Sequence, residues 1–166
     1  MDISYFSKDY LVKYLEINDV DSIYELSFNN PLFYQYCPPF VTRESILEDM
    51  KALPPNTDIA QKHYIGFFNG EKLIAIMDLI EGYPAKNIAF IGLFMMDKNI
   101  QGKGIGSKII EDSCEYLKEL DFEYVQLAYC KGNPQASHFW HKNYFLETGI
   151  EKDNGDYLAV VCQRKL

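Results

Sequence analysis

The chain has 166 residues, of which 24 are acidic and 16 basic, so its formal net charge at neutral pH is −8. This length fits one domain spanning residues 1–166, since domains commonly hold about 100–150 residues. No run of eighteen apolar residues is present, which excludes a membrane-spanning helix, and the acidic balance argues against a nucleic-acid partner. The first residues lack the basic and apolar stretches of a secretory signal, so we expect a cytoplasmic protein with no membrane partner.

The first third of the chain predicts a strand at residues 12–17, a helix at 20–28 and a second helix that starts at Thr42 and stops before Pro54. Asp19 is the expected N-cap of the first helix. Thr42, followed by Ser45 at the third helical position, is the expected cap of the second. Between the two helices, residues 31–40 form a segment rich in aromatic residues and prolines.

The remainder of the chain predicts six strands and two helices. The strands are expected at residues 63–68, 72–80, 87–96, 124–130, 145–150 and 156–164, and the helices at 104–120 and 134–142. The pair Asn69-Gly70 between two apolar runs is a strong hairpin signal. In the first of these helices, Ile109 and Leu117 mark an apolar face, and Asp112 lies on the polar face opposite.

The order of these elements defines the fold class. The strand–helix–strand unit from residue 87 to 130 implies a parallel strand pair with a right-handed crossover. Residues 63–96 imply an antiparallel meander instead. The predicted fold is therefore α+β, with a mixed, mostly antiparallel central sheet flanked by helices, and not a doubly wound parallel sheet.

The four cysteines have no metal-site spacing. They are Cys37, Cys114, Cys130 and Cys162, and no two of them form a CxxC pair. Without a secretion signal, we expect four reduced thiols, mostly in the core, and no metal site.

A glycine-rich turn joins the strand ending at Met96 to the following helix, with the sequence Gln101-Gly102-Lys103-Gly104-Ile105-Gly106-Ser107. Glycines let a ligand approach the backbone, and the first N–H groups of a helix attract anions. Such a turn is typical of a phosphate or pyrophosphate site, with Lys103 and Lys108 adding positive charge. It is neither a Walker loop nor a complete GxGxxG fingerprint, because Ser107 stands in the place of the third glycine.

Residues Gln101 to Gly106 resemble the Q/R-x-x-G-x-G/A signature of the GNAT-superfamily N-acetyltransferases. A second segment resembles that family's N-x-x-A-x-x-[FL]-Y-x-K-x-G-F motif at Asn133, Ala136, Phe139, Lys142 and Phe145. The order of elements also agrees over nearly the whole chain. The resemblance implies a GNAT-like fold, in which a splayed parallel pair of strands binds acyl-CoA.

The resemblance also implies acetyl-CoA as cosubstrate and no metal. The turn residues expected to hold the CoA pyrophosphate are Gln101, Gly102, Lys103, Gly104, Ile105, Gly106 and Ser107. The backbone of Phe94, Met95 and Met96 is expected to pair with the pantetheine arm, and an N–H there to polarise the thioester carbonyl. Asn133 and Lys142 are expected to join this site, although Asn133 before Pro134 also suits a helix N-cap.

The sequence departs from the family pattern at the acid that protonates the leaving thiolate. The usual tyrosine is replaced by Trp140, whose indole N–H can donate a hydrogen bond to sulfur but is not an acid near neutral pH. Tyr144, which stands where the family usually has glycine, is a second catalytic candidate. His138 and His141 are alternatives, and solvent could also supply the proton.

The general base is the second departure. Many family members carry a glutamate on the strand before the pyrophosphate turn, but residues 88–94 contain no carboxylate here. Asp78 and Glu81 on the neighbouring strand are the nearest candidates, with His63 as an alternative. A solvated or structural role remains open for each of the three.

The acceptor site in this family is shaped by the first two helices and their connection. That resemblance points to Phe33, Tyr34 and Tyr36, with Phe40 nearby, unless these aromatics form only a packed cluster. Residues 1–83 carry 13 acidic and 6 basic residues. We therefore expect a cationic amine acceptor attracted by this acidic half.

Two functions fit the motifs. The first is an acetyl-CoA-dependent N-acetyltransferase, in which an amine of a small-molecule acceptor attacks the thioester directly. The alternative is a catalytically weak or inactive acyl-CoA-binding regulatory module, motivated by Trp140 and the missing glutamate; an unrelated nucleotide binder is a third hypothesis. The final hairpin often helps relatives to dimerise, so a homodimer is also an expectation.

Overall fold

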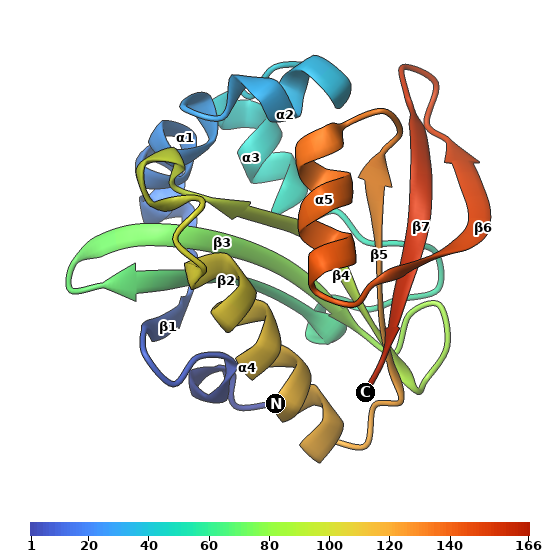
Figure 1. Cartoon of the computed structure of the whole chain (residues 1–166). Helices are drawn as coiled ribbons and strands as arrows, with labels where there is room; N and C mark the ends of the chain where they lie inside the picture. Colours follow the sequence, from blue (N-terminus) through green and yellow to red (C-terminus); the bar gives the residue numbers. More distant parts are fainter.

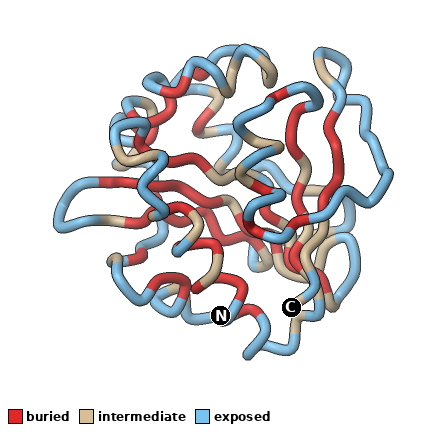
Figure 2. Tube along the Cα trace, in the orientation of Figure 1, coloured by how far each residue is buried: buried red, intermediate tan, exposed pale blue.

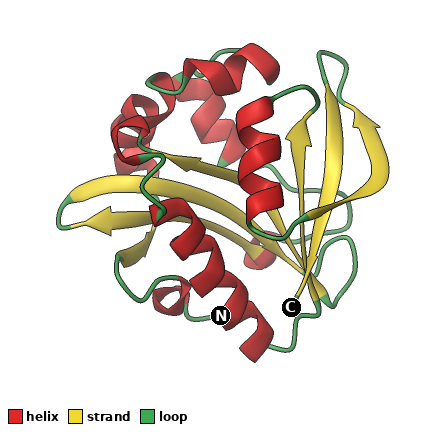
Figure 3. Cartoon of the chain, viewed as in Figure 1, coloured by secondary structure: helices red, strands yellow, loops and turns green.

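In the computed structural model, which describes residues 1–166, seven strands form one mixed sheet (Figures 1 and 3). The strands are β1 (Leu11–Tyr14), β2 (Lys62–Asn69), β3 (Lys72–Glu81), β4 (Ile88–Met96), β5 (Tyr124–Cys130), β6 (Leu146–Asp153) and β7 (Leu158–Lys165). Their order across the sheet is β1-β2-β3-β4-β5-β7-β6, and only β4 and β5 run parallel. The predicted mixed α+β sheet is confirmed.

Five α-helices flank the sheet: α1 (Val20–Phe28), α2 (Pro31–Tyr36), α3 (Arg43–Asp49), α4 (Ile105–Glu119) and α5 (Pro134–Lys142). The capping box of Thr42 and Ser45 at the start of α3 is confirmed. Asp19 makes no cap hydrogen bond to α1, because its carboxylate accepts from the Glu16 N–H at 2.8 Å within a short 3-10 turn. Helix α2 lies in the segment rich in aromatic residues and prolines, where no helix was expected, and it begins with Pro31, which suits a first helical position.

The two faces of the sheet carry separate cores. Figure 2 shows the buried stretches along the strands and helices that contribute to them. On one face α4 and α5 pack against the strands, with Ile109, Leu117 and Trp140 in the larger cluster. On the other face α1 and α3 contribute Ile23 and Ile46 to the smaller cluster. The sheet therefore separates α1–α3 from α4 and α5. None of the helices combines the length and the apolar character that a membrane span requires.

Asp112 of α4 is a correction to the predicted polar face, since it is 1% exposed. The N-terminal segment covers this part of α4, and the Asp112 carboxylate accepts a hydrogen bond from the Lys8 N–H at 3.0 Å. It also pairs with the ammonium of Lys108, one turn earlier in the helix. A segment distant in sequence thus buries a residue that its own helix would leave exposed.

The parallel pair β4–β5 separates after four residues, where Ile91 faces Leu127. Beyond that point β4 pairs only with β3, and β5 pairs only with β7, so the two strands diverge (Figure 1). At the point of separation, Gly92 is an extra residue in β4, because Asp78 faces Leu93 and Leu79 faces Ile91. The side of β4 that faces β5 therefore has no strand partner from Leu93 to Met96.

The prediction of four reduced thiols is wrong for two of the cysteines. Cys37 and Cys130 form a disulfide with a Cα–Cα distance of 5.9 Å, whereas Cys114 and Cys162 are free and buried. The bridge joins the end of α2 to the end of β5. Spacing along the chain carries no signal for it, because the two residues are 93 positions apart.

Candidate active site

A cleft of about 490 Å³ opens where β4 and β5 separate. Gly92 to Met96 of β4 form one wall, and residues of α5, including Phe139 and Trp140, form another. Asn30 and Phe33 line it from the α1–α2 side of the sheet. The cleft thus passes between the two faces of the sheet, so that residues of both cores reach it.

The predicted pyrophosphate turn lies at this cleft. Gly104 is the N-cap of α4 with φ +81°, a conformation that favours glycine, and no side chain caps the helix. The first turn of α4 contains no acidic residue, so its unpaired N–H groups remain available to an anion. A Cβ at Gly106 would collide with the Met96 sulfur, so this glycine allows α4 to approach the end of β4 closely.

Most of the predicted cofactor residues line the cleft: Phe94, Met95, Met96, Gln101, Gly102, Gly104, Gly106, Ser107, Asn133 and Lys142. Lys103 and Ile105 do not line it. Ile105 packs against the core instead, and Lys103 is exposed and forms no ion pair. Lys108, expected to add charge beside the turn, is paired with Asp112, and this pairing raises the pKa of the lysine.

The side chain of Gln101 connects three parts of the cleft. Its amide nitrogen donates to Asn30 Oδ1 at 2.8 Å and to the Met96 carbonyl at 3.1 Å. Its amide oxygen accepts from Gln135 of α5 at 3.0 Å. Sequence reasoning missed Asn30, although its buried side chain also donates to the Met96 carbonyl at 3.0 Å.

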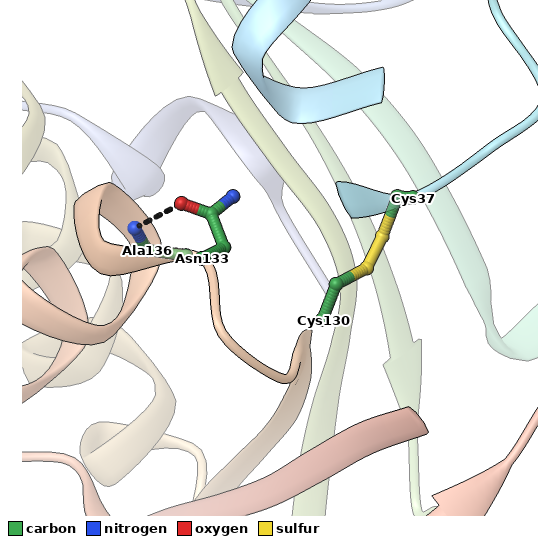
Figure 4. Close-up of a disulfide and its surroundings, with 4 residues drawn as sticks. All are labelled: Cys37, Cys130, Asn133 and Ala136. Carbon is green, nitrogen blue, oxygen red and sulfur yellow. Dashed lines mark hydrogen bonds between the residues drawn. A yellow bond between two sulfur atoms is a disulfide. The ribbon is translucent and has the colours of Figure 1, made fainter. Parts of the chain in front are cut away.

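Asn133 caps α5 and lines the cleft at the same time. Its side-chain oxygen accepts from the N–H groups of Gln135 and Ala136 at 3.1 Å each (Figure 4 shows the second bond). The cap is therefore confirmed. Its side-chain nitrogen donates to no group of the chain and is not sealed from solvent, since no fully buried polar side-chain atom lacks a partner.

Trp140 lies in an aromatic cluster at the cleft and is 7% exposed. Its ring contacts Phe139 and Phe145 edge-on, with centroids 4.9 and 5.1 Å away, and lies 6.1 Å from the ring of Phe94. The indole N–H has no hydrogen-bond acceptor in the chain and is not sealed from solvent. Trp140 thus keeps a free donor beside the cleft.

Tyr144 is not part of the cleft lining. Its side chain is 73% exposed on the surface, beneath the guanidinium of Arg164. Its φ of +66° explains why glycine suits this position in the family motif. Of the two histidines on α5, His138 lines the cleft and His141 does not.

Asp78 of β3 lies beside the cleft, behind Gly92. A Cβ at Gly92 would come within 3.0 Å of Asp78 Oδ2, so the absent side chain leaves the carboxylate next to the cleft wall. Lys62 of β2 donates to both Asp78 oxygens at 2.7 Å each, and the lysine side chain is only 2% exposed. Burial raises the pKa of Asp78, although the nearby Lys62 opposes this shift.

Glu81 lies on the opposite face of the sheet, because side chains alternate along a strand. It is hydrogen-bonded to His63 Nε2, while the hydroxyl of Tyr14 lies 2.7 Å from Nδ1 of the same ring. None of these three residues lines the cleft. Of the predicted base candidates, the structure brings only Asp78 close to it.

Only one of the predicted acceptor residues lines the cleft. Phe33 lines the cleft, but Tyr34, Tyr36 and Phe40 do not. Tyr34 packs against Phe33 and Phe40 with ring centroids 5.0 and 4.8 Å away, and burial raises its pKa. The aromatic segment therefore forms a packed cluster that presents one ring to the cleft.

Comparison with known proteins identifies the class of protein to which this fold and cleft belong. The model of the acetyltransferase (GNAT) family matches residues 21–145. Since this match covers well over half of the chain, the protein belongs to the GNAT acetyltransferase family. No curated protein sequence matches the chain.

Solved structures share the fold over nearly the full length. An acetyltransferase from Thermus thermophilus is 20% identical with a TM-score of 0.75, covering 95% of this chain and 97% of its own. Spermidine N-acetyltransferase from Vibrio cholerae, in complex with CoA and spermine, is 21% identical with a TM-score of 0.68, covering 96% of each chain. PaiA N-acetyltransferase from Thermoplasma acidophilum, in complex with coenzyme A, is 16% identical with a TM-score of 0.68, covering 95% of this chain and 99% of its own.

Proposed function

We propose that the protein is an acetyl-CoA-dependent N-acetyltransferase that acetylates a cationic small-molecule amine by direct attack on the thioester. One observation carries the proposal: the cleft between the diverging β4 and β5 joins the uncapped start of α4 to the unpaired side of β4. The start of α4 suits the pyrophosphate of CoA, because its N–H groups attract an anion. The unpaired side of β4 suits the extended pantetheine arm, which can pair with it like an added strand. Family membership and the fold shared with CoA-bound N-acetyltransferases support this proposal.

In this proposal Asp78 is the general base. Its carboxylate lies behind Gly92 at the cleft wall, and its raised pKa lies closer to neutral pH than that of an ordinary aspartate. Lys62 is a positioning residue, because its two hydrogen bonds fix the orientation of the carboxylate. The carboxylate that many relatives carry on β4 would thus come from β3 through the space left by glycine.

Trp140 would act as a hydrogen-bond donor and not as an acid. Its indole N–H lacks a partner within the chain and is not sealed from solvent, and the residue lines the cleft, which suits a contact to the thioester sulfur. The proton for the leaving thiolate would then come from solvent. A backbone N–H of Phe94 to Met96 would polarise the thioester carbonyl.

The proposal of a cationic acceptor rests on the negative charge of residues 1–83 and on the substrate of one structural neighbour. The acidic half of the chain forms β1–β3 and α1–α3, which include the acceptor side of the cleft. The Vibrio cholerae neighbour acts on spermidine, an amine of this class. If the field attracts the acceptor, kcat/KM should fall as ionic strength rises, and a rate insensitive to salt would contradict the attraction.

The alternative is an acyl-CoA-binding regulatory module with little or no turnover. The absence of a phenol at Trp140 and the engagement of Asp78 with Lys62 favour it. CoA binding without thiol release across polyamines, diamines, amino acids and peptides would establish this alternative over the enzyme.

The test of the proposed function is thermal stabilisation by CoA, together with thiol release from acetyl-CoA in the presence of that amine panel. Gly104→Glu should abolish the CoA-induced rise in Tm, since it places a carboxylate at the start of α4. Gly149→Glu is the matched control, because Gly149 has the same φ of +81° and equally open surroundings but lies in β6. Equal CoA stabilisation of both variants would refute the cofactor site.

Location and assembly belong to the same proposal. A cytoplasmic location would give the enzyme access to acetyl-CoA and is tested by cell fractionation.

A homodimer is supported by β6, in which every residue is exposed, including the apolar Leu146 and Ile150. Light scattering at a monomer mass would exclude this assembly.

A further inference from the structure

The Cys37–Cys130 disulfide lies within the cleft and differs from the other two cysteines in its surroundings. The bridge connects the end of α2 to the end of β5 (Figure 4). Both bridged residues line the cleft, and Cys37 is only half-buried. Cys114 and Cys162 are sealed in the core, where burial raises their thiol pKa to about 12 and about 11. Thiolates carry out thiol–disulfide exchange, so these two thiols are unsuited to it.

The bridge also fixes the C-terminal end of α2, whose other contacts are the Asn30 anchor at its start and the packing of Phe33 and Tyr34 against the smaller core. None of the six residues of α2 is buried. At its start, Asn30 attaches the helix to Gln101 and to the Met96 carbonyl. At its end, the disulfide connects Cys37 to β5, while Pro38 to Phe40 beyond it are largely exposed. The helix in turn places Phe33 in the cleft wall.

We propose that Cys37–Cys130 is a thiol–disulfide exchange site, which small-molecule thiols open and small-molecule disulfides close. We further propose that its state controls how firmly residues 31–41 are held against the cleft. The exchange chemistry stands without the proposed acetyltransferase activity, and only its consequence for acceptor binding rests on that activity.

The exchange proceeds in two balanced steps. A thiolate attacks the more accessible sulfur, that of Cys37, which forms a mixed disulfide and releases Cys130 as a thiolate that takes a proton from water. A second thiolate attacks the mixed disulfide, which releases Cys37 and a small-molecule disulfide. Two electrons pass from two thiols to the bridge, and an oxidised small-molecule disulfide closes it by the reverse steps.

CoA is one source of such a thiol, because the proposed cofactor site and the bridge share one cleft. Glutathione from bulk solution is the other. In the oxidised form the acceptor wall is complete. In the reduced form α2 keeps its Asn30 anchor and the packing of Phe33 and Tyr34 but loses the link at its C-terminal end, so acceptor affinity should fall while CoA binding at α4 persists.

The experiment uses the full chain and needs no known acceptor. The folded protein is treated with glutathione or CoA, unfolded, alkylated without further reduction, and analysed by mass spectrometry. We expect two alkylated cysteines before treatment and four after it, with oxidised glutathione restoring the first state. Hydrogen exchange should rise at least tenfold in residues 31–41 on reduction and in Cys130→Ser, but not in Cys162→Ala. Both redox forms should retain the CoA-induced rise in Tm.

Three results would overturn the proposal: four alkylated cysteines before any treatment, a bridge that thiols reduce only after unfolding, or unchanged hydrogen exchange in residues 31–41. Reduction of the bridge by either thiol supports the proposal. If CoA reduces it faster than an equal concentration of glutathione, the thiol reaches the bridge from the proposed cofactor site. Equal rates show that the thiol comes from bulk solution. Failure of CoA to stabilise either redox form would instead count against the proposed function, which separates the two ideas.

Discussion

The proposed cofactor side and the proposed acceptor side of the cleft are built from different chemical groups. The cofactor side consists of backbone, namely the uncapped start of α4 and the unpaired side of β4, and it lies within residues 92–107. The proposed acceptor side depends on side chains from distant segments: Phe33 of α2 in the cleft lining, and the Lys62–Asp78 pair of β2 and β3 behind Gly92. Backbone groups depend little on side-chain identity, so a cofactor side of this kind tolerates sequence change, whereas an acceptor side made of side chains changes with the sequence.

The strongest test of this difference is Asp78→Asn. We expect kcat to fall by about 10²–10⁴-fold, the range for loss of a general base, while CoA still raises Tm because the cofactor side is untouched. Burial raises the pKa of Asp78, so activity should rise with pH through a value above the ordinary aspartate pKa of about 3.9. That acid limb of the kcat/KM profile should disappear in the variant.

Glu81→Gln is the control for Asp78, since Glu81 lies on the other face of the sheet. It should keep the wild-type rate and pH profile. An Asp78→Asn enzyme with full activity, or a Glu81→Gln enzyme with none, would show that the base has been assigned to the wrong carboxylate.

The next largest effect concerns the bridge between the two sides. The disulfide links residues 93 positions apart and so lowers the conformational entropy of the unfolded chain. Its loss should therefore lower the free energy of unfolding by about 4 kcal/mol. Reductant should therefore lower the guanidinium midpoint of the wild-type protein. It should not lower that of a Cys37→Ser, Cys130→Ser double variant, and equal sensitivity of the two proteins would contradict the prediction.

A smaller effect is expected on the cofactor side from Gly106→Ala. The added methyl group would collide with the Met96 sulfur and come within 3.2 Å of the Phe139 ring, so the buried Met96 side chain or α4 itself must shift. Overpacking of this kind costs about 1–3 kcal/mol and should also weaken CoA binding. Ser107→Ala in the same turn is the control for stability, which denaturant titration of both variants measures; a Gly106→Ala protein as stable as this control would refute the close packing.

The smallest effect is expected for Trp140→Phe. It removes the indole N–H but keeps an aromatic ring among Phe94, Phe139 and Phe145. Loss of one hydrogen bond of about 1 kcal/mol corresponds to a decrease of about fivefold in kcat. Steady-state kinetics at saturating acetyl-CoA measures it, and an unchanged kcat would exclude a contact from this N–H to the sulfur.

Features that depend on residues adjacent in the sequence could be predicted from the sequence alone. Each predicted strand overlaps an observed one, although β1 ends at Tyr14 and not at residue 17, the Asn69-Gly70 pair marked its hairpin, and Thr42 and Asn133 were identified as caps. The glycine-rich turn at Gly104 also belongs here. Caps, turns and helix N-termini obey local backbone geometry, so a few adjacent residues are enough to specify them.

Which distant groups meet depends on the tertiary structure. The fold buries Asp112 beneath the N-terminal segment, places Asp78 behind Gly92 and against Lys62, and joins Cys37 to Cys130. It also keeps Glu81 and Tyr144 away from the cleft. These outcomes depend on sheet order, on the bulge in β4 and on the unpredicted helix α2. Such long-range contacts follow from how whole elements pack, and local periodicity contains no record of them.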